Sequence, residues 1–298
     1  MNEYAIHEGG YQAVITSQGG ALRQLRYQDR DLIVPFPAGG PIPDYRGIIA
    51  APWPNRIADG TYTYDGITFN VAVNEPERSC ALHGLVFETR WVLEDCGDAW
   101  VTLGCFIRPS PGYPFTLSIR ARYRLDKDGL TLSVTATNVG GNTAPYGVCP
   151  HPYLVAGPAP LDEWTMQVPA KEFLDVSRDR LLPIATRTLD GHEFDFRTPR
   201  PIGTTMIDHA FTGLDFDRHG RAQAVIRDPG GTGVGIEWDR TSPWVQIHTA
   251  DKKPPLPDRL GLAVEPMTCP PDAFNSGKDL VQLKPAGTHH TSWRIFSL

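Results

Sequence analysis

A histidine enclosed by two prolines is the first candidate for chemistry in this chain. His151 follows Pro150 and precedes Pro152 in the stretch VCPHPY. Proline fixes φ near about −65° and drives the preceding residue towards extended geometry. The imidazole therefore stands on stiff backbone, where it can donate or accept a proton near neutral pH. A proline-rich loop whose histidine caps a backbone carbonyl is the structural alternative.

A carboxylate late in the chain is the second candidate. Glu265 ends an apolar run that starts at Leu262, and Pro266 follows it. Burial against apolar neighbours raises the pKa of a glutamic acid and makes it a useful base. A surface position before a proline is the alternative. Together, Glu265 and His151 offer an acid–base pair.

Other polar groups suit an oxygen-rich ligand. His83 precedes Gly84, and glycine permits close approach of a backbone or a ligand. Arg56 presents a rigid fork of donors, although it could instead pair with Asp59 on the surface. The remaining polar candidates are Asn55, Asp208, His209 and Gln246. Each of these has a structural alternative. His83 could be a hydrogen-bonded histidine of the core or of a turn, Asp208 could be a turn residue, and Gln246 could lie on the outer face of a strand.

Composition excludes several classes of protein. The net charge of −6 and the absence of a long Lys/Arg block disfavour a nucleic-acid binder. No signal peptide or membrane span is expected, because the first residues lack a basic start and no window approaches about 18 apolar residues. The 5 cysteines form no C-x-x-C pair, which argues against structural zinc or a disulfide framework and favours the cytoplasm. No metal or nucleotide motif is present, so no metal or cofactor is expected.

The elements that must position these residues are predicted to be strands. The 29 glycines and 28 prolines punctuate short segments throughout the chain, as in all-β folds. Thr61–Tyr64 and Ile67–Val71 flank Asp65-Gly66, which suits a type I′ hairpin turn. Phe115–Tyr123 alternates with period two and returns through Asp128-Gly129 into Leu130–Ala136.

Further strands are predicted at Tyr11–Thr16, Ala99–Phe106, Thr165–Val168, Ala222–Arg227, Gly233–Trp238 and Trp244–Thr249. Gly230–Gly233 reads as a hairpin turn, and helical periodicity is nearly absent. Long hairpins must pair into sheets whose inner faces pack on each other. With no internal repeat or clear boundary, the sequence predicts one large antiparallel β-sandwich domain over residues 1–298.

These motifs, in this order and spacing, resemble the aldose 1-epimerase (galactose mutarotase) family. The resemblance runs from Asn55-Arg56 to the segment at Pro271–Asn275, which is nearly the whole chain. It implies a large β-sandwich and an isomerase that interconverts the α and β anomers of a free aldohexose. Such an enzyme needs no cofactor or metal, takes a small-molecule sugar as its partner, and is a monomer or a homodimer.

The resemblance also implies roles for individual residues. His151 matches the family's general acid, and Glu265 matches its general base. His83 matches the histidine that contacts the region of the sugar ring. The residues that match sugar-binding positions are Asn55, Arg56, Tyr153, Asp208 and Gln246. Leu85, Leu154-Val155 and Met267 depart from the family pattern and bear on which sugar is bound.

Three other functions stay open at this point. A sugar-phosphate epimerase would need cations such as Arg78, Arg90 or Lys252-Lys253. A carbohydrate-binding or sensing protein on the same fold would need no acid–base pair. A polysaccharide-acting enzyme would usually need a longer cleft and further domains. Trp53, Trp238 and Trp244 are candidates to stack on a sugar, with core packing as the default for each.

Overall fold

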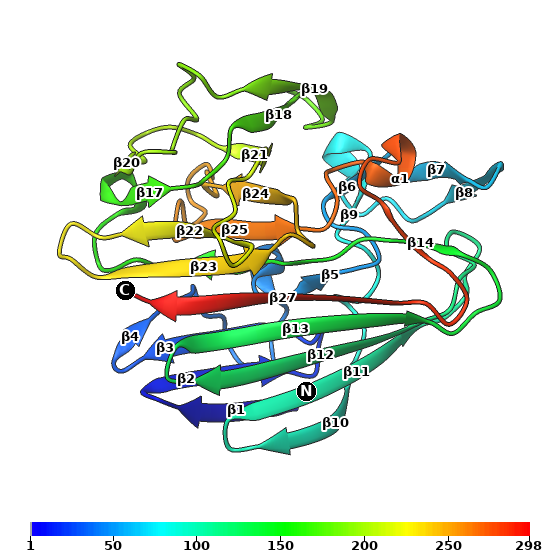
Figure 1. Ribbon diagram of the computed structural model, residues 1–298, viewed down its shortest axis with the longest axis horizontal. Coiled ribbons are helices and arrows are strands. Elements are labelled where there is room, and N and C mark those ends of the chain that lie inside the picture. Colours follow the sequence, from blue (N-terminus) through cyan, green and yellow to red (C-terminus); the bar gives the residue numbers. More distant parts are fainter. Residues whose placement is uncertain (1) are drawn as a thin grey trace.

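The computed structural model describes residues 2–298, and nearly all of its regular structure is antiparallel strand. Figure 1 shows long strands crossing the molecule in one broad sheet. Among residues 2–298, nine strands form this sheet in the order β10 (Val92–Gly97), β11 (Trp100–Ile107), β12 (Leu117–Asp126), β13 (Gly129–Asn138), β27 (Thr288–Ser297), β23 (Gly233–Asp239), β22 (Arg221–Arg227), β17 (Thr165–Gln167) and β20 (Arg200–Pro201). The predicted all-β fold is confirmed.

Two further sheets face this one. The first contains, in spatial order, β1 (Glu3–Glu8), β2 (Tyr11–Thr16), β3 (Leu22–Tyr27) and β4 (Arg30–Asp31). The second contains, in spatial order, β16 (Tyr153–Leu154), β25 (Leu262–Met267), β24 (Trp244–His248), β21 (Asp208–Thr212), β18 (Glu172–Val176) and β19 (Pro183–Thr188). One continuous apolar core includes Val134, Leu25 and Val264, which come from the three sheets. The predicted β-sandwich is therefore held by burial between facing sheets.

Short strand pairs and helical turns complete the fold. The pairs are β5 (Ile49–Ala50) with β15 (Cys149–Pro150), β6 (Arg56–Ala58) with β9 (Cys80–Leu82), β7 (Thr61–Tyr64) with β8 (Ile67–Asn70), and β14 (Ala144–Tyr146) with β26 (Val281–Leu283). The helical turns are η1 (Pro43–Tyr45), η2 (Pro76–Arg78), η3 (Leu161–Glu163) and α1 (Ala273–Ser276). No helix within residues 2–298 is long and apolar enough to cross a membrane.

The predicted long hairpin is present, with shifted ends. In β12 and β13, Leu117 pairs with Asn138 and Asp126 pairs with Gly129. The strand begins at Leu117 and not at Phe115, because the segment before it is not part of the ladder. Alternate residues of both strands are buried, as the period-two pattern requires. The hairpin at Asp65-Gly66 is also confirmed, since both residues have positive φ.

The other predicted strands agree with the structure to within one or two residues. They appear as β2, β11, β17, β22, β23 and β24, and the predicted hairpin turn at Gly230–Gly233 lies in the connection between β22 and β23, which spans residues 228–232. Sequence reasoning missed β27, which lies between β13 and β23. Its buried residues Thr291, Trp293 and Ile295 alternate with more exposed ones, so the period-two signal was present.

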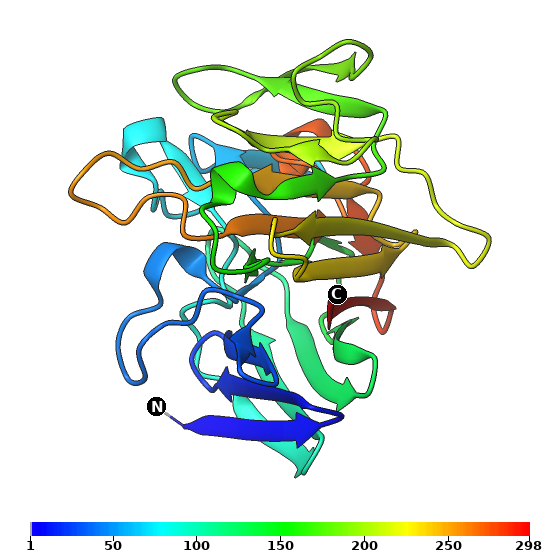
Figure 2. The ribbon, with the colours of Figure 1, turned by 90° about the vertical axis from the view of Figure 1, so that its left-hand side faces the viewer.

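Several loops project from the same side of the molecule. In Figure 2 they are the blue loop around residue 40, the cyan turn around residue 77 and the orange loop around residue 255. Two of them are tied together, because Lys252 Nζ contacts Asp44 Oδ1 at 2.5 Å. These loops border the group of polar residues described next.

Candidate active site

One face of the sheet that contains β24 and β25 gathers most of the predicted site residues. Gln246 on β24 is the register partner of Glu265 on β25. Asp208 on β21 is the register partner of His248, and Tyr153 on β16 is the register partner of Ala263. Register partners and residues two apart share a face of a sheet. The intervening residues, such as Val264, belong to the main core.

His151 and His83 reach this face from two short strand pairs. The backbone of His151 is fixed from both sides, since its N–H donates to Ile48 and its carbonyl accepts from Gly47. His83 follows β9 and has φ 61°, a left-handed conformation that is uncommon outside glycine, although asparagine, aspartate and histidine adopt it more often than other residues. Gly84 permits this path, because a Cβ there would lie 2.1 Å from the carbonyl oxygen of Ala51.

The acid–base pair expected from the sequence is brought together. His151 Nε2 lies 3.4 Å from Glu265 Oε1, and the ring centroids of His151 and His83 are 4.8 Å apart. Glu265 is 2% exposed and His151 is 4% exposed. Behind the pair, the thiol of Cys149 donates to Glu265 Oε2 at 3.8 Å. The geometry holds two titratable groups in direct contact in the interior.

Burial governs the protonation of this pair. Burial, together with the negative charge of Asp208, raises the pKa of Glu265 well above its ordinary value. Burial, with the nearby His248, lowers the pKa of His151 to about 3. The pKa of His83 is also lowered, by burial and then by His151. Burial therefore favours the arrangement of the pair without separated charges.

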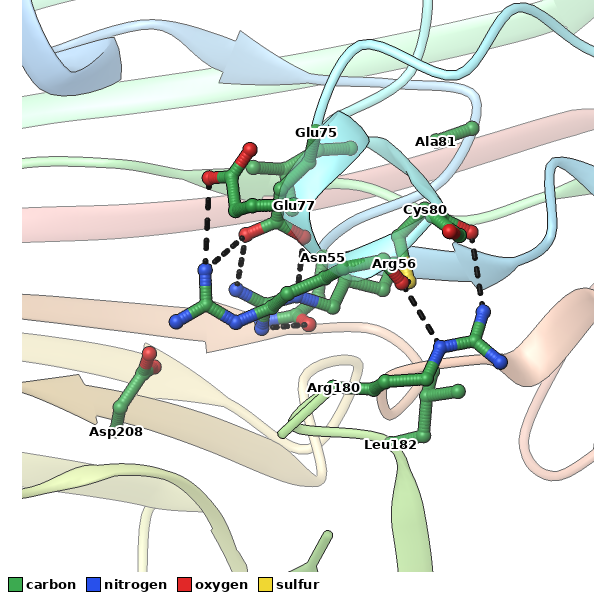
Figure 3. A network of polar contacts seen from close by, with 12 residues as sticks. Asn55, Arg56, Glu75, Glu77, Cys80, Ala81, Arg180, Leu182 and Asp208 are labelled. Atoms are coloured by element: carbon green, nitrogen blue, oxygen red, sulfur yellow. Dashed lines mark hydrogen bonds and ion pairs between the residues drawn. The ribbon is translucent and has the colours of Figure 1, made fainter. Parts of the chain in front are cut away.

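Arg56 is held by a carboxylate that the sequence did not indicate. Glu75 accepts from Arg56 Nε at 2.7 Å and from Arg56 Nη2 at 2.8 Å, and both residues are buried. Figure 3 shows this fork above Asp208, with Asn55 beside it. Asn55 Oδ1 accepts from Arg56 Nη1 at 3.3 Å. The fork fixes the direction of the guanidinium, and no sequence signal singles out Glu75.

Two alternatives from the sequence are settled by these contacts. The pairing of Arg56 with Asp59 is wrong, because Asp59 Oδ1 accepts from Arg180 Nη2 at 2.7 Å. Gln246 does not point outwards either, since it is 2% exposed. His209 lies apart from the site and packs against Phe194 with a centroid separation of 4.8 Å.

The Arg56–Glu75 pair supplies a prediction about stability. Replacing Glu75 by glutamine removes one partner of a buried ion pair, so the free energy of unfolding should fall by about 3–5 kcal/mol. Glu77 lies in the same turn and, within residues 2–298, pairs only with the partly exposed Arg78, at 3.6 Å. Glu77→Gln should therefore change the stability by less than about 0.5 kcal/mol. Urea unfolding of both variants tests this, and equal effects would contradict the role given to Glu75.

Asp208 and Gln246 form a polar pair at the outer side of the group. Gln246 Nε2 donates to Asp208 Oδ1 at 2.6 Å, and His248 Nδ1 lies 3.8 Å from the same oxygen. Burial raises the pKa of Asp208, but His248, Arg56 and Gln246 outweigh it and lower that pKa overall. Asp208 is therefore a carboxylate at neutral pH. Sequence reasoning missed His248, although its position two residues after Gln246 places it on the same face.

The aromatic residues of the site differ from those considered in the sequence. Trp53, Trp238 and Trp244 are 3%, 0% and 2% exposed, so core packing accounts for all of them. Tyr153 lies at the site, and its ring stacks on His151 with a centroid separation of 5.4 Å. Tyr45, which no sequence signal indicated, is half-buried and lies 4.8 Å from the ring of His83.

Three of these side chains could hold a metal ion. His83, His151 and Glu265 each offer one ligand atom, and these atoms all lie within 4.8 Å of one another. The sequence gave no metal motif because the three residues come from separate segments.

Comparison with known proteins decides the family. The family model for aldose 1-epimerase matches residues 3–297. This chain belongs to the aldose 1-epimerase family. The uncharacterized protein YihR of Escherichia coli is 35% identical over 295 residues, which cover 98% of this chain and 92% of YihR. The galactose mutarotase of Sus scrofa is 27% identical over 282 residues, covering 85% of this chain and 79% of the relative.

Solved structures of the family share the fold. The GalM/aldose epimerase homologue from C. elegans has a TM-score of 0.87 at 18% identity, and the match covers 100% of this chain and 98% of that one. The galactose 1-epimerase from Lactobacillus acidophilus has a TM-score of 0.82 at 16% identity, with 99% and 94% covered. At these identities, the similarity supports the β-sandwich and does not identify a substrate.

The positions that depart from the family pattern lie close to the site or behind it. Met267 is fully buried and packs in a small apolar cluster with Cys149 and Trp244. Leu154 is fully buried in the main core, and Leu85 packs against that core while partly exposed.

Proposed function

We propose that this member of the aldose 1-epimerase family is a mutarotase that interconverts the α and β anomers of a free aldohexose. The observation that carries the proposal is the buried contact of His151 Nε2 with Glu265 Oε1 at 3.4 Å. A protein that only binds sugar needs no such pair. The groups proposed to bind the sugar surround this contact. An enzyme needs both features, because it must hold the sugar ring and exchange protons with it.

The proposed reaction has balanced proton steps. Glu265, as a carboxylate, removes the proton of the C1 hydroxyl, and protonated His151 delivers a proton to the ring oxygen as the C1–O bond opens. Rotation about C1–C2 and the reverse steps close the ring on the other face. A bound sugar places hydroxyls against the carboxylate of Glu265. These hydrogen bonds stabilise the form with a carboxylate and a protonated His151 over the uncharged form that burial favours. Each positioned acid or base typically contributes about 10²–10⁴-fold.

The contacts that hold the ring are proposed to lie away from C1. Binding must tolerate both anomers, so the fixed hydrogen bonds should go to other hydroxyls. Asp208 is an ionised acceptor, Arg56 is a preoriented donor, and Gln246 bridges towards Asp208 at 2.6 Å. Asn55 and His83 complete the polar lining, and the stacked Tyr153 and the half-buried Tyr45 supply aromatic surface.

Anomer exchange tests the proposal directly. Freshly dissolved α-D-glucose and α-D-galactose are followed by polarimetry or NMR with and without the protein, after subtraction of the uncatalysed rate. The expected result is acceleration of at least one sugar by the wild type. Detectable sugar binding without acceleration of any aldohexose would instead favour a sensing protein on the same fold.

A sugar phosphate is the second candidate, and one observation favours it. Arg46 and Lys252 both pair with Asp44, which leaves one net positive charge at this point. The Arg46 guanidinium also lies 5.7 Å from the centre of the Tyr153 ring. Arg78, in contrast, is engaged by Glu75 at 3.0 Å. A higher kcat/KM for a hexose 6-phosphate than for the free hexose, lost in Lys252→Ala, would select this candidate.

A further inference from the structure

The two histidines and the glutamate of the proposed acid–base site have donor atoms free in the interior. His83 and His151 are 5% and 4% exposed, and each Nδ1 lacks a hydrogen-bond partner among the described residues. Among the described residues, Glu265 is engaged only by the weak thiol donor of Cys149 and by the contact with His151. Buried polar atoms normally have partners, so each imidazole lacks the hydrogen bond through Nδ1 that would usually fix its ring.

The spacing of these donors is close to that of a zinc site. Zinc binds histidine nitrogen and carboxylate oxygen at about 2.0–2.2 Å, so tetrahedral ligand atoms lie about 3.3–3.6 Å apart. The separation of His151 Nε2 and Glu265 Oε1 is already 3.4 Å. The ligand atoms of all three residues lie within 4.8 Å of one another. Side-chain movements of little more than about 1 Å would bring them to the spacing of a tetrahedral zinc site.

The charge around the donors also suits a divalent cation. Glu265 and Asp208 place two carboxyl groups on this face of the sheet, while the Arg56 guanidinium is paired with Glu75. Metals bind unprotonated imidazole nitrogen and carboxylate oxygen, so an ion at this place must displace any proton that Glu265 and His151 hold.

We infer that His83, His151 and Glu265 form a binding site for a divalent transition-metal ion such as Zn²⁺, and that the bound ion switches off the acid–base pair. The ion takes the lone pairs through which Glu265 accepts a proton and His151 carries one. A two-histidine, one-carboxylate set leaves a fourth position open, which a water or a sugar hydroxyl can fill. The switching part of the inference rests on the proposed mutarotase function, and the binding part does not.

Metal binding is measured first, without reference to activity. Zn²⁺ is titrated into EDTA-stripped protein by calorimetry, and Co²⁺ is added to a second sample to record its visible absorption. His83→Asn is the informative variant, because asparagine tolerates the left-handed backbone at φ 61° and is a poor zinc ligand. His248→Asn is the matched control, since His248 is a neighbouring imidazole outside the three donors. We expect one equivalent bound by wild type and His248→Asn, and at least about a hundredfold weaker binding by His83→Asn.

Inhibition is measured separately on the wild type. Zn²⁺ should abolish anomer exchange at the concentration that saturates the calorimetric site, EDTA should restore it, and excess sugar should shift the inhibition to higher Zn²⁺. Failure to bind one equivalent, or equal affinity in His83→Asn, overturns the metal site whatever the activity. Stoichiometric binding with unchanged turnover overturns the switch. If the wild type lacks mutarotase activity, the calorimetric result still decides the metal site.

Discussion

Glu265→Gln should lower kcat for anomer exchange by about a thousandfold, equivalent to about 4 kcal/mol in the barrier. Glutamine has nearly the same shape as glutamate but cannot accept the proton of the C1 hydroxyl. Glu265 is 2% exposed and contacts His151 and Cys149, so an isosteric change preserves its packing. The loss should therefore appear in the chemical step and leave the fold intact.

Sugar binding provides the control for this variant. The proposed hydroxyl contacts come from Arg56, Asp208 and Gln246, so the Kd for galactose measured by calorimetry should change by less than about threefold, or 0.7 kcal/mol. Unfolding curves of wild type and variant should also agree closely. Glutamine is neutral, and burial disfavours a negative charge at this position, so the change removes no stabilising charge. Normal turnover by Glu265→Gln would remove Glu265 from the role of base.

The strands were predictable where local pattern dominated. The predicted hairpins at Asp65-Gly66 and Asp128-Gly129 combine a turn signal with alternating residues, and both hairpins form, although the second turn lies one residue earlier, at Lys127-Asp128. The strand β27 was missed although it alternates, which shows that the signal weakens when polar residues such as His289 and His290 share the strand. Sheet order depends on contacts between distant segments, and no local pattern encodes it.

The site shows the same division between local and long-range information. His151 and Glu265 were indicated by their immediate neighbours, and Tyr153 by its place in the same motif. Glu75 and Tyr45 could not be indicated, because their importance depends on what the fold brings to them. Glu75 meets Arg56 from the residue just before η2, and Tyr45 meets His83 from a turn. The metal-capable group of His83, His151 and Glu265 is likewise a product of the fold.

His151→Ala should lose rate mainly through kcat, by about 10²–10⁴-fold, with a smaller change in KM. His151 is proposed to deliver the proton to the ring oxygen, and other residues hold the sugar hydroxyls. Because alanine leaves a gap beside Tyr153, His151→Gln is measured in parallel to separate lost packing from lost proton transfer. A rise in KM with unchanged kcat would make His151 a binding residue.

The double variant Glu265→Gln/His151→Ala decides whether the two residues act as a unit. Ring opening removes one proton and delivers another in the same event, so either single change already disables the coupled transfer. The double variant should therefore be about as slow as the slower single variant, because groups that act as a unit are strongly non-additive. If the two losses multiply instead, the 3.4 Å contact joins two groups that act independently, and the proton path must lie elsewhere.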